Sequence, residues 1–189
     1  CGYAWVHAHI HGMDKLPTGE RFLFVCNHRS KFDPIISWYI FRKNHLAFIS
    51  KPENFNVPVF GRFIRKCCFM TIDRSDARSS LGTFTKAAEL MKNDVVSVGV
   101  YPEGRRNRDG SLLPFHDGVF IIARKADVPI VVATIDGTEK ITHNYPWKRT
   151  HIRLDIVGVI DRDFVNTHRT AAVGVAVREM MENNLKGTE

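Results

Sequence analysis

Residues 27–33, NHRSKFD, combine a histidine and an aspartate directly after an apolar, β-branched run that ends at Cys26. An aspartate at the start of the next helix can fold back and accept a hydrogen bond from one imidazole nitrogen, which leaves the other nitrogen as a base. Such a histidine can remove a proton from an attacking hydroxyl. The pattern is compatible with catalysis by His28 and Asp33. Spacing alone also permits a second interpretation, in which Asp33 only caps a helix that starts with Pro34.

A second polar cluster, residues 101–108 (YPEGRRNR), also follows an apolar run and holds three arginines within four residues. Gly104 allows a tight turn or a close approach to a ligand, and arginine binds phosphate and carboxylate groups through two parallel hydrogen bonds. The functional interpretation is a phosphate or carboxylate site formed by Gly104 and the three arginines. The alternative is a basic surface loop that binds RNA nonspecifically or binds nothing. Glu103 argues against a simple nucleic-acid patch, because its carboxylate would repel phosphates unless it holds an arginine.

A third cluster starts with Lys51 and runs to Asp73 and Arg74, at the end of another apolar segment. Lysine and arginine at the end of a strand can hold a phosphate, and arginine does so with directional donors. The alternative for Asp73 and Arg74 is a turn exposed to solvent. Taken alone, the cluster fits the exposed turn better than a phosphate site.

The elements that must position these clusters are short apolar runs that alternate with longer helical patterns. Strands are predicted at Val6–Ile10, Arg21–Cys26, Ala47–Ser50, Cys68–Ile72, Val95–Tyr101, Val128–Ile135 and Ile152–Val159. Helices are predicted at Asp33–Arg42, Ala77–Met91, Gly118–Lys125 and Thr167–Leu185. Several strands are apolar on both faces, which is typical of a sheet covered by helices on both sides. The sequence predicts an α/β fold with a mixed, largely parallel sheet of about seven strands flanked by helices.

In an open α/β sheet, ligands bind beyond the carboxyl ends of the strands. All three polar clusters follow predicted strands, so we expect them to converge along one edge of the sheet. This convergence would place the predicted base of residues 27–33 opposite the arginines of residues 105–108.

Composition indicates one folded domain over residues 1–189, because 44% of the residues are hydrophobic and 25% are charged. A net charge of +7 favours an anionic partner: nucleic acid, an acidic membrane surface or a phosphorylated substrate. No stretch approaches the ~20 apolar residues that span a bilayer. The chain begins with Cys1 rather than methionine, so we expect that an N-terminal membrane segment could precede it.

Together the clusters resemble the motifs of the glycerolipid acyltransferases, specifically the 1-acylglycerol-3-phosphate O-acyltransferase family. The first motif, Asn-His-x-x-x-x-Asp with an internal serine, is matched by Asn27, His28, Ser30 and Asp33. The second is matched by Lys51, Glu53, Gly61, Asp73 and Arg74, and the third, Phe-Pro-Glu-Gly-Thr-Arg, by Tyr101, Pro102, Glu103, Gly104 and Arg106. The fourth is Val128-Pro129-Ile130. The motifs occur in the family's order between about Val6 and Gly137.

The sequence departs from the family pattern at three places. Arg105 stands where the third motif usually has threonine, His116-Asp117 replaces a basic pair, and Val132 replaces a second proline. The predicted catalytic pair is intact, so the departures bear on donor and acceptor preference.

The resemblance implies a glycerol-phosphate acyltransferase-like fold and transfer of an acyl group from acyl-CoA or acyl-carrier protein to the sn-2 hydroxyl of 1-acyl-glycerol-3-phosphate, giving phosphatidic acid. His28 would be the general base, oriented by Asp33. The predicted acceptor site is Glu103, Gly104 and Arg106, with Ser30, Lys51 and Arg74 as further substrate-binding residues. Neither a metal nor another cofactor is implied, because a thioester is already activated. The implied partners are lysophosphatidic acid, the acyl thioester and a membrane surface, at the cytoplasmic face of the cell membrane, with no nucleic acid.

Other interpretations remain open. The enzyme could acylate a different lysolipid or polar-lipid hydroxyl, or the chain could be a non-catalytic lipid-binding or basic nucleic-acid-binding module. His7, His9 and His11 share one face of a predicted strand, as metal ligands sometimes do, but the opposite face is apolar, and an edge strand with one face in water explains the pattern. The apolar helix after Asp33 could lie on a membrane or in the core.

Overall fold

The computed structural model describes residues 2–3, 5–67, 69–72 and 77–187. Its described strands form one eight-stranded sheet in the order β1-β2-β8-β7-β3-β6-β4-β5. These strands are β1 (Gly2–Tyr3), β2 (Val6–His11), β3 (Leu23–Cys26), β4 (Leu46–Ser50), β5 (Met70–Thr71), β6 (Ser97–Val100), β7 (Ile130–Asp136) and β8 (Thr150–Ile160). The five strands from β7 to β5 are parallel to their neighbours, whereas β8 is antiparallel to β7 and parallel to β2. The prediction of a mixed, largely parallel sheet is confirmed.

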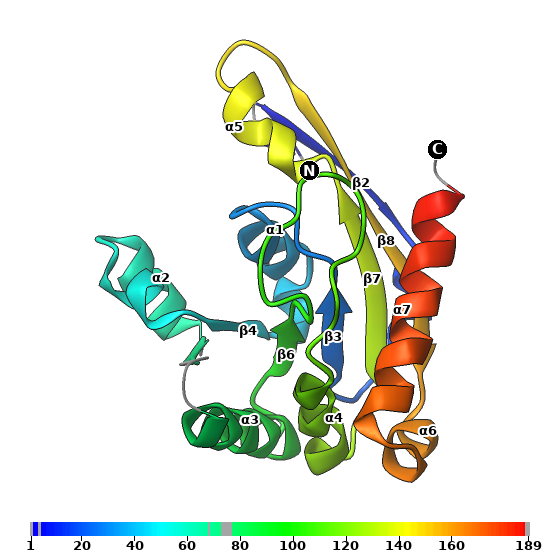
Figure 1. The fold of residues 1–189 in the computed structure, drawn as a ribbon. Coiled ribbons are helices and arrows are strands. Elements are labelled where there is room, and N and C mark those ends of the chain that lie inside the picture. The colour runs from blue at the N-terminus through cyan, green and yellow to red at the C-terminus, as the bar shows by residue number, and fades with distance from the viewer. Residues whose placement is uncertain (1, 4, 68, 73–76, 188–189) are drawn as a thin grey trace.

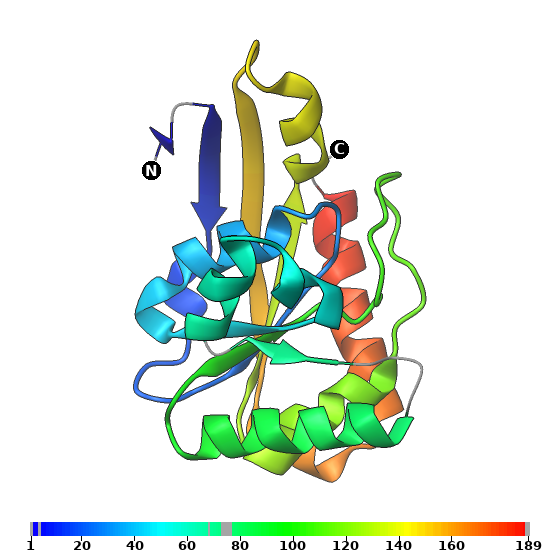
Figure 2. The ribbon, with the colours of Figure 1, turned by 90° about the vertical axis from the view of Figure 1, so that its left-hand side faces the viewer.

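The sheet is flanked by helices on both faces (Figures 1 and 2). The α-helices are α1 (Asp33–Ile40), α2 (Phe60–Lys66), α3 (Ala77–Lys92), α4 (Ile121–Ala126), α5 (Ile141–Asn144), α6 (Arg162–Thr167) and α7 (Thr170–Lys186). The described residues also form five 3-10 helices: η1 (Met13–Lys15), η2 (Arg42–Asn44), η3 (Pro52–Asn56), η4 (Asp117–Phe120) and η5 (Thr138–Lys140).

Side chains alternate in direction along the central strands, and this shows which helices cover each face of the sheet. Phe24 of β3 points to the α1 side, where its ring lies 4.8 Å from that of Phe41. Phe24 pairs with Val131 of β7, and three residues later Thr134 points to the opposite face, where it accepts a hydrogen bond from Asn184 of α7. The central strand β3 is fully buried between these layers, as its continuous apolar sequence predicts.

All seven predicted strands are present, and their ends differ from the predicted ends by no more than two residues. The predicted start of one of them, Cys68, lies outside the described residues. The helix predicted over Thr167–Leu185 is α7, which begins three residues later and ends one residue later than predicted, and the short helix α6 before it was not predicted. Helix α6 begins at Arg162 because the Asp161 carboxylate caps it by accepting a hydrogen bond from the Phe164 amide.

The prediction that Asp33 caps the following helix is wrong. Helix α1 begins at Asp33 itself, Phe32 occupies the cap position, and no side chain caps the helix. The Asp33 carboxylate is turned back toward the preceding loop instead, where backbone amides hold it. Helix α1 packs against the core, with Ser37 buried and Ile35 exposed.

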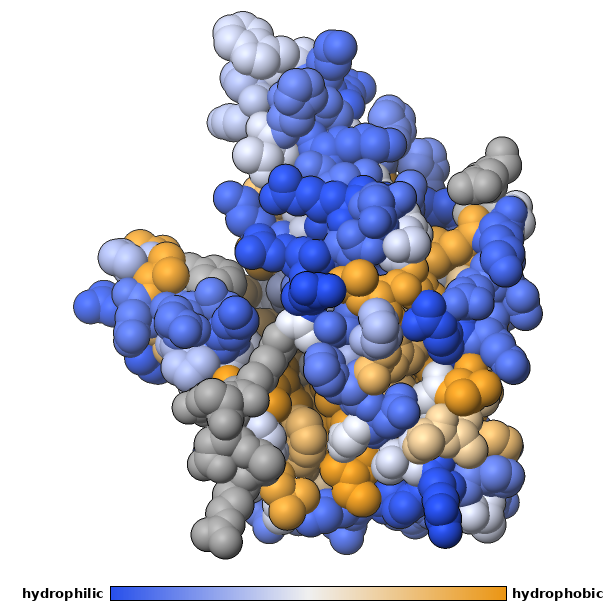
Figure 3. Space-filling model, viewed as in Figure 1, coloured by the Kyte–Doolittle hydropathy of each residue, from blue (hydrophilic) through white to orange (hydrophobic). Residues whose placement is uncertain are grey.

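Strands β2 and β8 form a ribbon that extends past the carboxyl edge of the sheet. The last residue of β7, Asp136, pairs with Arg153, so β8 has already run from Thr150 beyond this edge. Strand β2 accompanies it, with Val6 opposite Thr150. Helix α5 lies beside the ribbon, and this end of the molecule is blue to pale blue in Figure 3. This projecting end of the β2–β8 ribbon, with the turn between α5 and β8, therefore extends beyond the edge at which β3 and β6 end.

No helix in the part of the chain that the structure describes is both long and apolar enough to cross a bilayer.

Candidate active site

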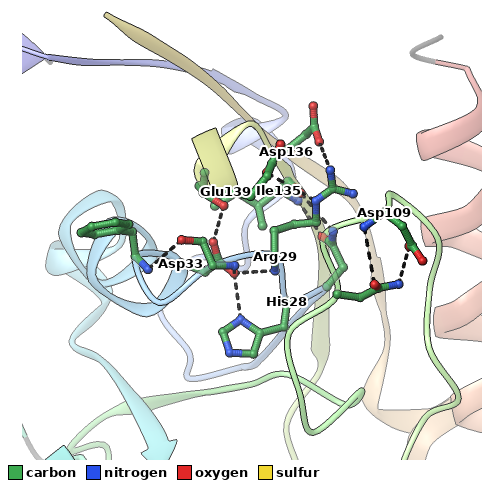
Figure 4. A network of polar contacts seen from close by, with 12 residues as sticks. His28, Arg29, Asp33, Asp109, Ile135, Asp136 and Glu139 are labelled. Carbon is green, nitrogen blue, oxygen red and sulfur yellow. Dashed lines mark hydrogen bonds and ion pairs between the residues drawn. The ribbon is translucent and has the colours of Figure 1, made fainter. Parts of the chain in front are cut away.

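The loop after β3 folds back so that the side chains of His28 and Asp33 meet (Figure 4). The His28 Nδ1 atom lies 2.8 Å from Oδ2 of Asp33. Because Nδ1 faces the carboxylate, Nε2 is the ring nitrogen left to exchange a proton with a substrate. The His28 side chain is 18% exposed and that of Asp33 is fully buried. The contact predicted between these two residues is therefore present, with the histidine at the surface of the pair.

The buried carboxylate of Asp33 has four hydrogen-bond partners. Besides His28, its Oδ2 atom accepts hydrogen bonds from the backbone amides of Arg29 and Ser30, each at 2.7 Å. Its Oδ1 atom accepts one from the hydroxyl of Thr138 at 2.5 Å. Donors of this kind stabilise the ionised carboxylate, so Asp33 is suited to orient the imidazole and to balance a positive charge on it.

Glu103, at the end of β6, braces the backbone of the same loop. Its Oε1 atom accepts a hydrogen bond from the His28 amide at 2.7 Å, and its Oε2 atom accepts one from the Leu113 amide at 2.9 Å. The residue is buried, and burial raises the pKa of the Glu103 carboxyl, an effect opposed by these two amides. The carboxylate therefore ties three segments together, an arrangement that the sequence did not predict.

The ring of Tyr101 supports the imidazole from one side. It stacks on His28 with ring centroids 4.2 Å apart and planes 17° apart, and on Phe48 of β4 at 5.4 Å and 7°. Burial raises the pKa of the Tyr101 hydroxyl well above its usual range, and the Asp33 carboxylate adds to the rise. In the described structure this hydroxyl makes no hydrogen bond of normal geometry. Tyr101 thus acts on His28 through its ring.

The arginine-rich loop, residues 101–108, is hydrogen-bonded directly to the histidine loop, residues 27–33. The Asn107 amide donates a hydrogen bond to the His28 carbonyl oxygen at 2.7 Å. Arg105 and Arg106 are exposed on this loop. A pocket of about 360 Å³ lies along it and is lined by Glu103, Gly104, Arg105, Leu113, Pro114 and His116. The predicted convergence of residues 27–33 with residues 101–108 is confirmed.

The remaining predicted residues lie in different surroundings. The hydroxyl of Ser30 accepts a hydrogen bond from the Phe32 amide inside the loop, and Ser30 is buried. Lys51 is exposed directly after β4, at the same edge of the sheet. Arg74 lies outside the described residues, so its placement stays a prediction.

Sequence reasoning did not single out Arg29 or Thr138. The buried Arg29 guanidinium lies 3.0 Å from Asp136 and 3.5 Å from Glu139, so it joins the first loop to the end of β7 (Figure 4). Thr138 holds Asp33 from the same segment. The polar residues 136–139 follow a buried strand, and the criterion that identified the other clusters would have found them.

Two further residues with reactive side chains, Cys26 and His9, lie outside the contacts described above. Cys26 is fully buried, and burial raises the pKa of its thiol well above the usual range, which opposes a role as nucleophile. His9 lies on the wet face of β2, with its Nε2 atom 3.2 Å from Nδ1 of His151. The described residues include no group of three or more histidine, cysteine or carboxylate side chains placed to hold a metal ion.

Residues 7–136 match the protein family described as Acyltransferase. The chain belongs to the acyltransferase family. The matched segment contains the histidine loop, the Glu103 brace and the arginine-rich loop, and it ends at the last residue of β7.

Individual relatives agree with this assignment. The 1-acyl-sn-glycerol-3-phosphate acyltransferase BAT2, chloroplastic, of Brassica napus is 36% identical over 140 residues, which are 74% of this chain and 40% of that protein. The 1-acyl-sn-glycerol-3-phosphate acyltransferase of Haemophilus influenzae is 24% identical over 166 residues, 88% of this chain and 69% of that protein. This acyltransferase chain spans less than half the length of the Brassica napus relative.

A solved structure matches the fold. The crystal structure of the 1-acyl-sn-glycerophosphate (LPA) acyltransferase PlsC from Thermotoga maritima superimposes with a TM-score of 0.76 and 26% sequence identity, covering 96% of this chain and 71% of that chain. The resemblance predicted from four ordered motifs and the predicted fold are both confirmed.

Proposed function

We propose that this acyltransferase moves a fatty acyl group from a thioester, acyl-CoA or acyl-carrier protein, to the sn-2 hydroxyl of 1-acyl-glycerol-3-phosphate, giving phosphatidic acid. Relatives that carry this activity in their names support the acceptor. The observation that carries the mechanism is the contact between His28 Nδ1 and Asp33, which leaves Nε2 for the substrate.

In the proposed reaction, Nε2 of His28 removes the proton of the acceptor hydroxyl as its oxygen attacks the thioester carbonyl carbon. The new C–O bond forms, the C–S bond breaks, and the imidazolium returns its proton to the departing thiolate. Asp33 stabilises the imidazolium through Nδ1. No acyl-enzyme is required. Neither a metal ion nor a redox cofactor takes part in this scheme.

The arginine-rich loop supplies the proposed acceptor site. Arg106 is exposed on a loop that is hydrogen-bonded to the His28 backbone through Asn107. A guanidinium there can bind the acceptor phosphate through two hydrogen bonds, with Gly104 allowing close approach. Glu103 holds the loop and the base in a fixed relation rather than contacting the phosphate. Lys51 and Arg74 are proposed as additional phosphate ligands.

A different lysolipid acceptor is the second candidate. The observation that favours it is the pocket beside the brace, because Arg105 and His116, two of the positions that depart from the family pattern, both line it. Arg105 adds a positive charge to the family pattern, whereas His116-Asp117 replaces a basic pair, so the charges around this pocket are arranged for a headgroup that differs from glycerol phosphate. The proposed site of action in both cases is a membrane surface; the cytoplasmic face stays a prediction.

The test is release of free thiol from acyl-CoA and from acyl-carrier protein across a panel of lysolipid acceptors. We expect His28→Ala to lower turnover by ~10²–10⁴ while the thermal unfolding midpoint stays near that of the wild type. His143→Ala, which removes an exposed histidine of α5, is the matched control and should keep full turnover. Turnover retained in folded His28→Ala would refute the mechanism, and a preferred acceptor other than 1-acyl-glycerol-3-phosphate would favour the second candidate.

A further inference from the structure

The projecting end of the β2–β8 ribbon carries exposed aromatic side chains. Trp147 is 84% exposed and Tyr145 is 60% exposed, and both lie in the turn between α5 and β8. Trp5, 42% exposed, meets Tyr145 edge to face with ring centroids 6.3 Å apart. The Thr150 amide donates to the Trp5 carbonyl oxygen at 2.7 Å, which joins the two strands there. Tryptophan and tyrosine with an apolar ring and a polar edge favour the boundary between water and lipid.

The charges around these rings are of one sign. Residues 140–153, KITHNYPWKRTHIR, contain no aspartate or glutamate. Lys140, Lys148 and Arg149 are exposed there, whereas Arg153 is paired with Asp155. The two nearest acidic side chains on the preceding segment, Asp136 and Glu139, are held by Arg29. The projecting end is therefore complementary to a negatively charged surface.

The position of this end relative to the base is defined by the sheet. His28 follows β3 at the carboxyl edge, and β7 ends at the same edge with Asp136 opposite Arg153. The four residues of β8 and its turn that precede Arg153 extend ~13 Å beyond that pair at 3.3 Å per residue. A surface that contacts Trp147 therefore faces the edge at which the proposed reaction takes place (Figures 1 and 2).

We infer that residues 145–149 form an interfacial anchor that binds the headgroup layer of an anionic lipid bilayer, with Trp147 inserted and Lys148 and Arg149 on the lipid phosphates. The inference goes beyond the proposed acyl transfer, because it concerns binding without turnover. Single-stranded nucleic acid also binds aromatic and basic residues, but it does so in grooves that track its backbone. The present end is a convex projection, which suits a flat layer of headgroups.

The test is sedimentation of the full chain with vesicles that contain 30% phosphatidylglycerol in phosphatidylcholine. A basic side chain near an anionic surface contributes ~1 kcal/mol, about fivefold in affinity, so Lys148→Gln/Arg149→Gln should weaken binding about 25-fold. Trp147→Ser should weaken it about tenfold. Binding of the wild type should fall with added salt and be weak on pure phosphatidylcholine.

Matched controls come from α3, at the other end of the molecule. Lys86→Gln/Lys92→Gln removes two exposed lysines and Leu81→Ser an exposed apolar side chain that is 51% exposed; both should bind vesicles as the wild type does. The inference would be overturned if the control variants and the variants at residues 147–149 (the tip variants) lost vesicle binding equally. Unchanged vesicle binding in the tip variants would also overturn it. So would binding of a single-stranded oligonucleotide without binding of vesicles.

Failure of the proposed reaction would look different. It would appear as absent thiol release in the wild type and would leave the vesicle measurements as they are. If the anchor inference holds, His28→Ala binds vesicles normally, and the tip variants keep thiol release with a dispersed short-chain acceptor.

Discussion

The carboxylate that orients the His28 imidazole is itself held in place by several hydrogen bonds. Its carboxylate is fully buried and accepts from two backbone amides, the Thr138 hydroxyl and Nδ1 of His28. Three donors on Oδ2 and one on Oδ1 restrict the orientation of the carboxylate, and the His28 ring is hydrogen-bonded to this fixed group. The imidazole of the proposed base is thus positioned by contacts that lie outside the proposed acceptor site.

Tyr101 gives a test of how the imidazole is supported. Its ring stacks on His28, but its buried hydroxyl makes no normal hydrogen bond in the described structure. Tyr101→Phe should therefore leave turnover unchanged and raise or preserve stability, since no hydrogen bond is lost. Tyr101→Ala should lower kcat by about 10²-fold with a smaller change in KM, because a base that is displaced from its reacting position loses rate.

Thiol-release kinetics and thermal unfolding of the two variants decide the matter. Loss of turnover in Tyr101→Phe would assign a role to the hydroxyl, and full kcat in a folded Tyr101→Ala protein would remove the stack from the mechanism.

At the level of single residues, the sequence predicted the pair and missed its supports. His28 and Asp33 are five residues apart and their contact is local, so spacing was informative. The brace by Glu103 and the hydroxyl of Thr138 reach the loop from positions 75 and 105 residues away from their partners. Such contacts depend on how β3, β6 and β7 are ordered in the sheet, and residue type alone does not contain that order.

Gly99 of β6 links the packing of an element to the site. A Cβ atom added at Gly99 would lie 2.3 Å from Cε1 of Phe48, the ring on which Tyr101 stacks. Gly99→Ala should therefore displace Phe48, lower the free energy of unfolding by ~1–3 kcal/mol, and lower turnover through Tyr101 and His28.

Gly82 offers the matched control on an exposed position of α3. A Cβ atom there meets nothing within 4 Å, so Gly82→Ala should stabilise the protein by up to ~1 kcal/mol without a change in turnover. Denaturant unfolding and thiol release measure both effects. An unchanged free energy of unfolding in Gly99→Ala would show that Phe48 has room to move.

The sequence predicted a strand or helix accurately where its buried residues form a continuous apolar run. It failed where a short helix is stabilised mainly by tertiary contacts. Strands β3 and β7 are apolar on both faces and were located to within two residues. Helices α2 and α5 have seven and four residues, which is too short for helix propensity to be decisive. These two helices are stabilised by packing against the rest of the fold, which cannot be recognised in their own short sequences.

At the scale of the whole molecule, histidines from distant parts of the chain meet on one face of the β2–β8 ribbon. The rings of His7, His9 and His151 lie with centroids 4.8 to 5.5 Å apart. Desolvation lowers the pKa of His7, and the neighbouring His9 and His151 lower it further.

A lowered histidine pKa in the folded state makes stability depend on pH. Below pH 6.5 the unfolded chain binds a proton that the folded His7 resists, so stability should fall as the pH falls through and below 6.5 and should be insensitive to this group above it. His7→Asn should show a smaller drop in the thermal midpoint between pH 7 and pH 5 than the wild type. His143→Asn, outside the cluster, should follow the wild type, and parallel profiles for wild type and His7→Asn would contradict the prediction.

The backbone of His28 is shared by two neighbours: its amide donates to Glu103 and its carbonyl accepts from Asn107. Evolution toward a new headgroup must therefore work on a segment that also carries the base. Mutations that reshape the arginine-rich loop would shift the imidazole as well, and selection for altered acceptor preference should recover compensating changes at the histidine loop. Diversity in this lineage would then accumulate as co-varying pairs rather than as independent substitutions.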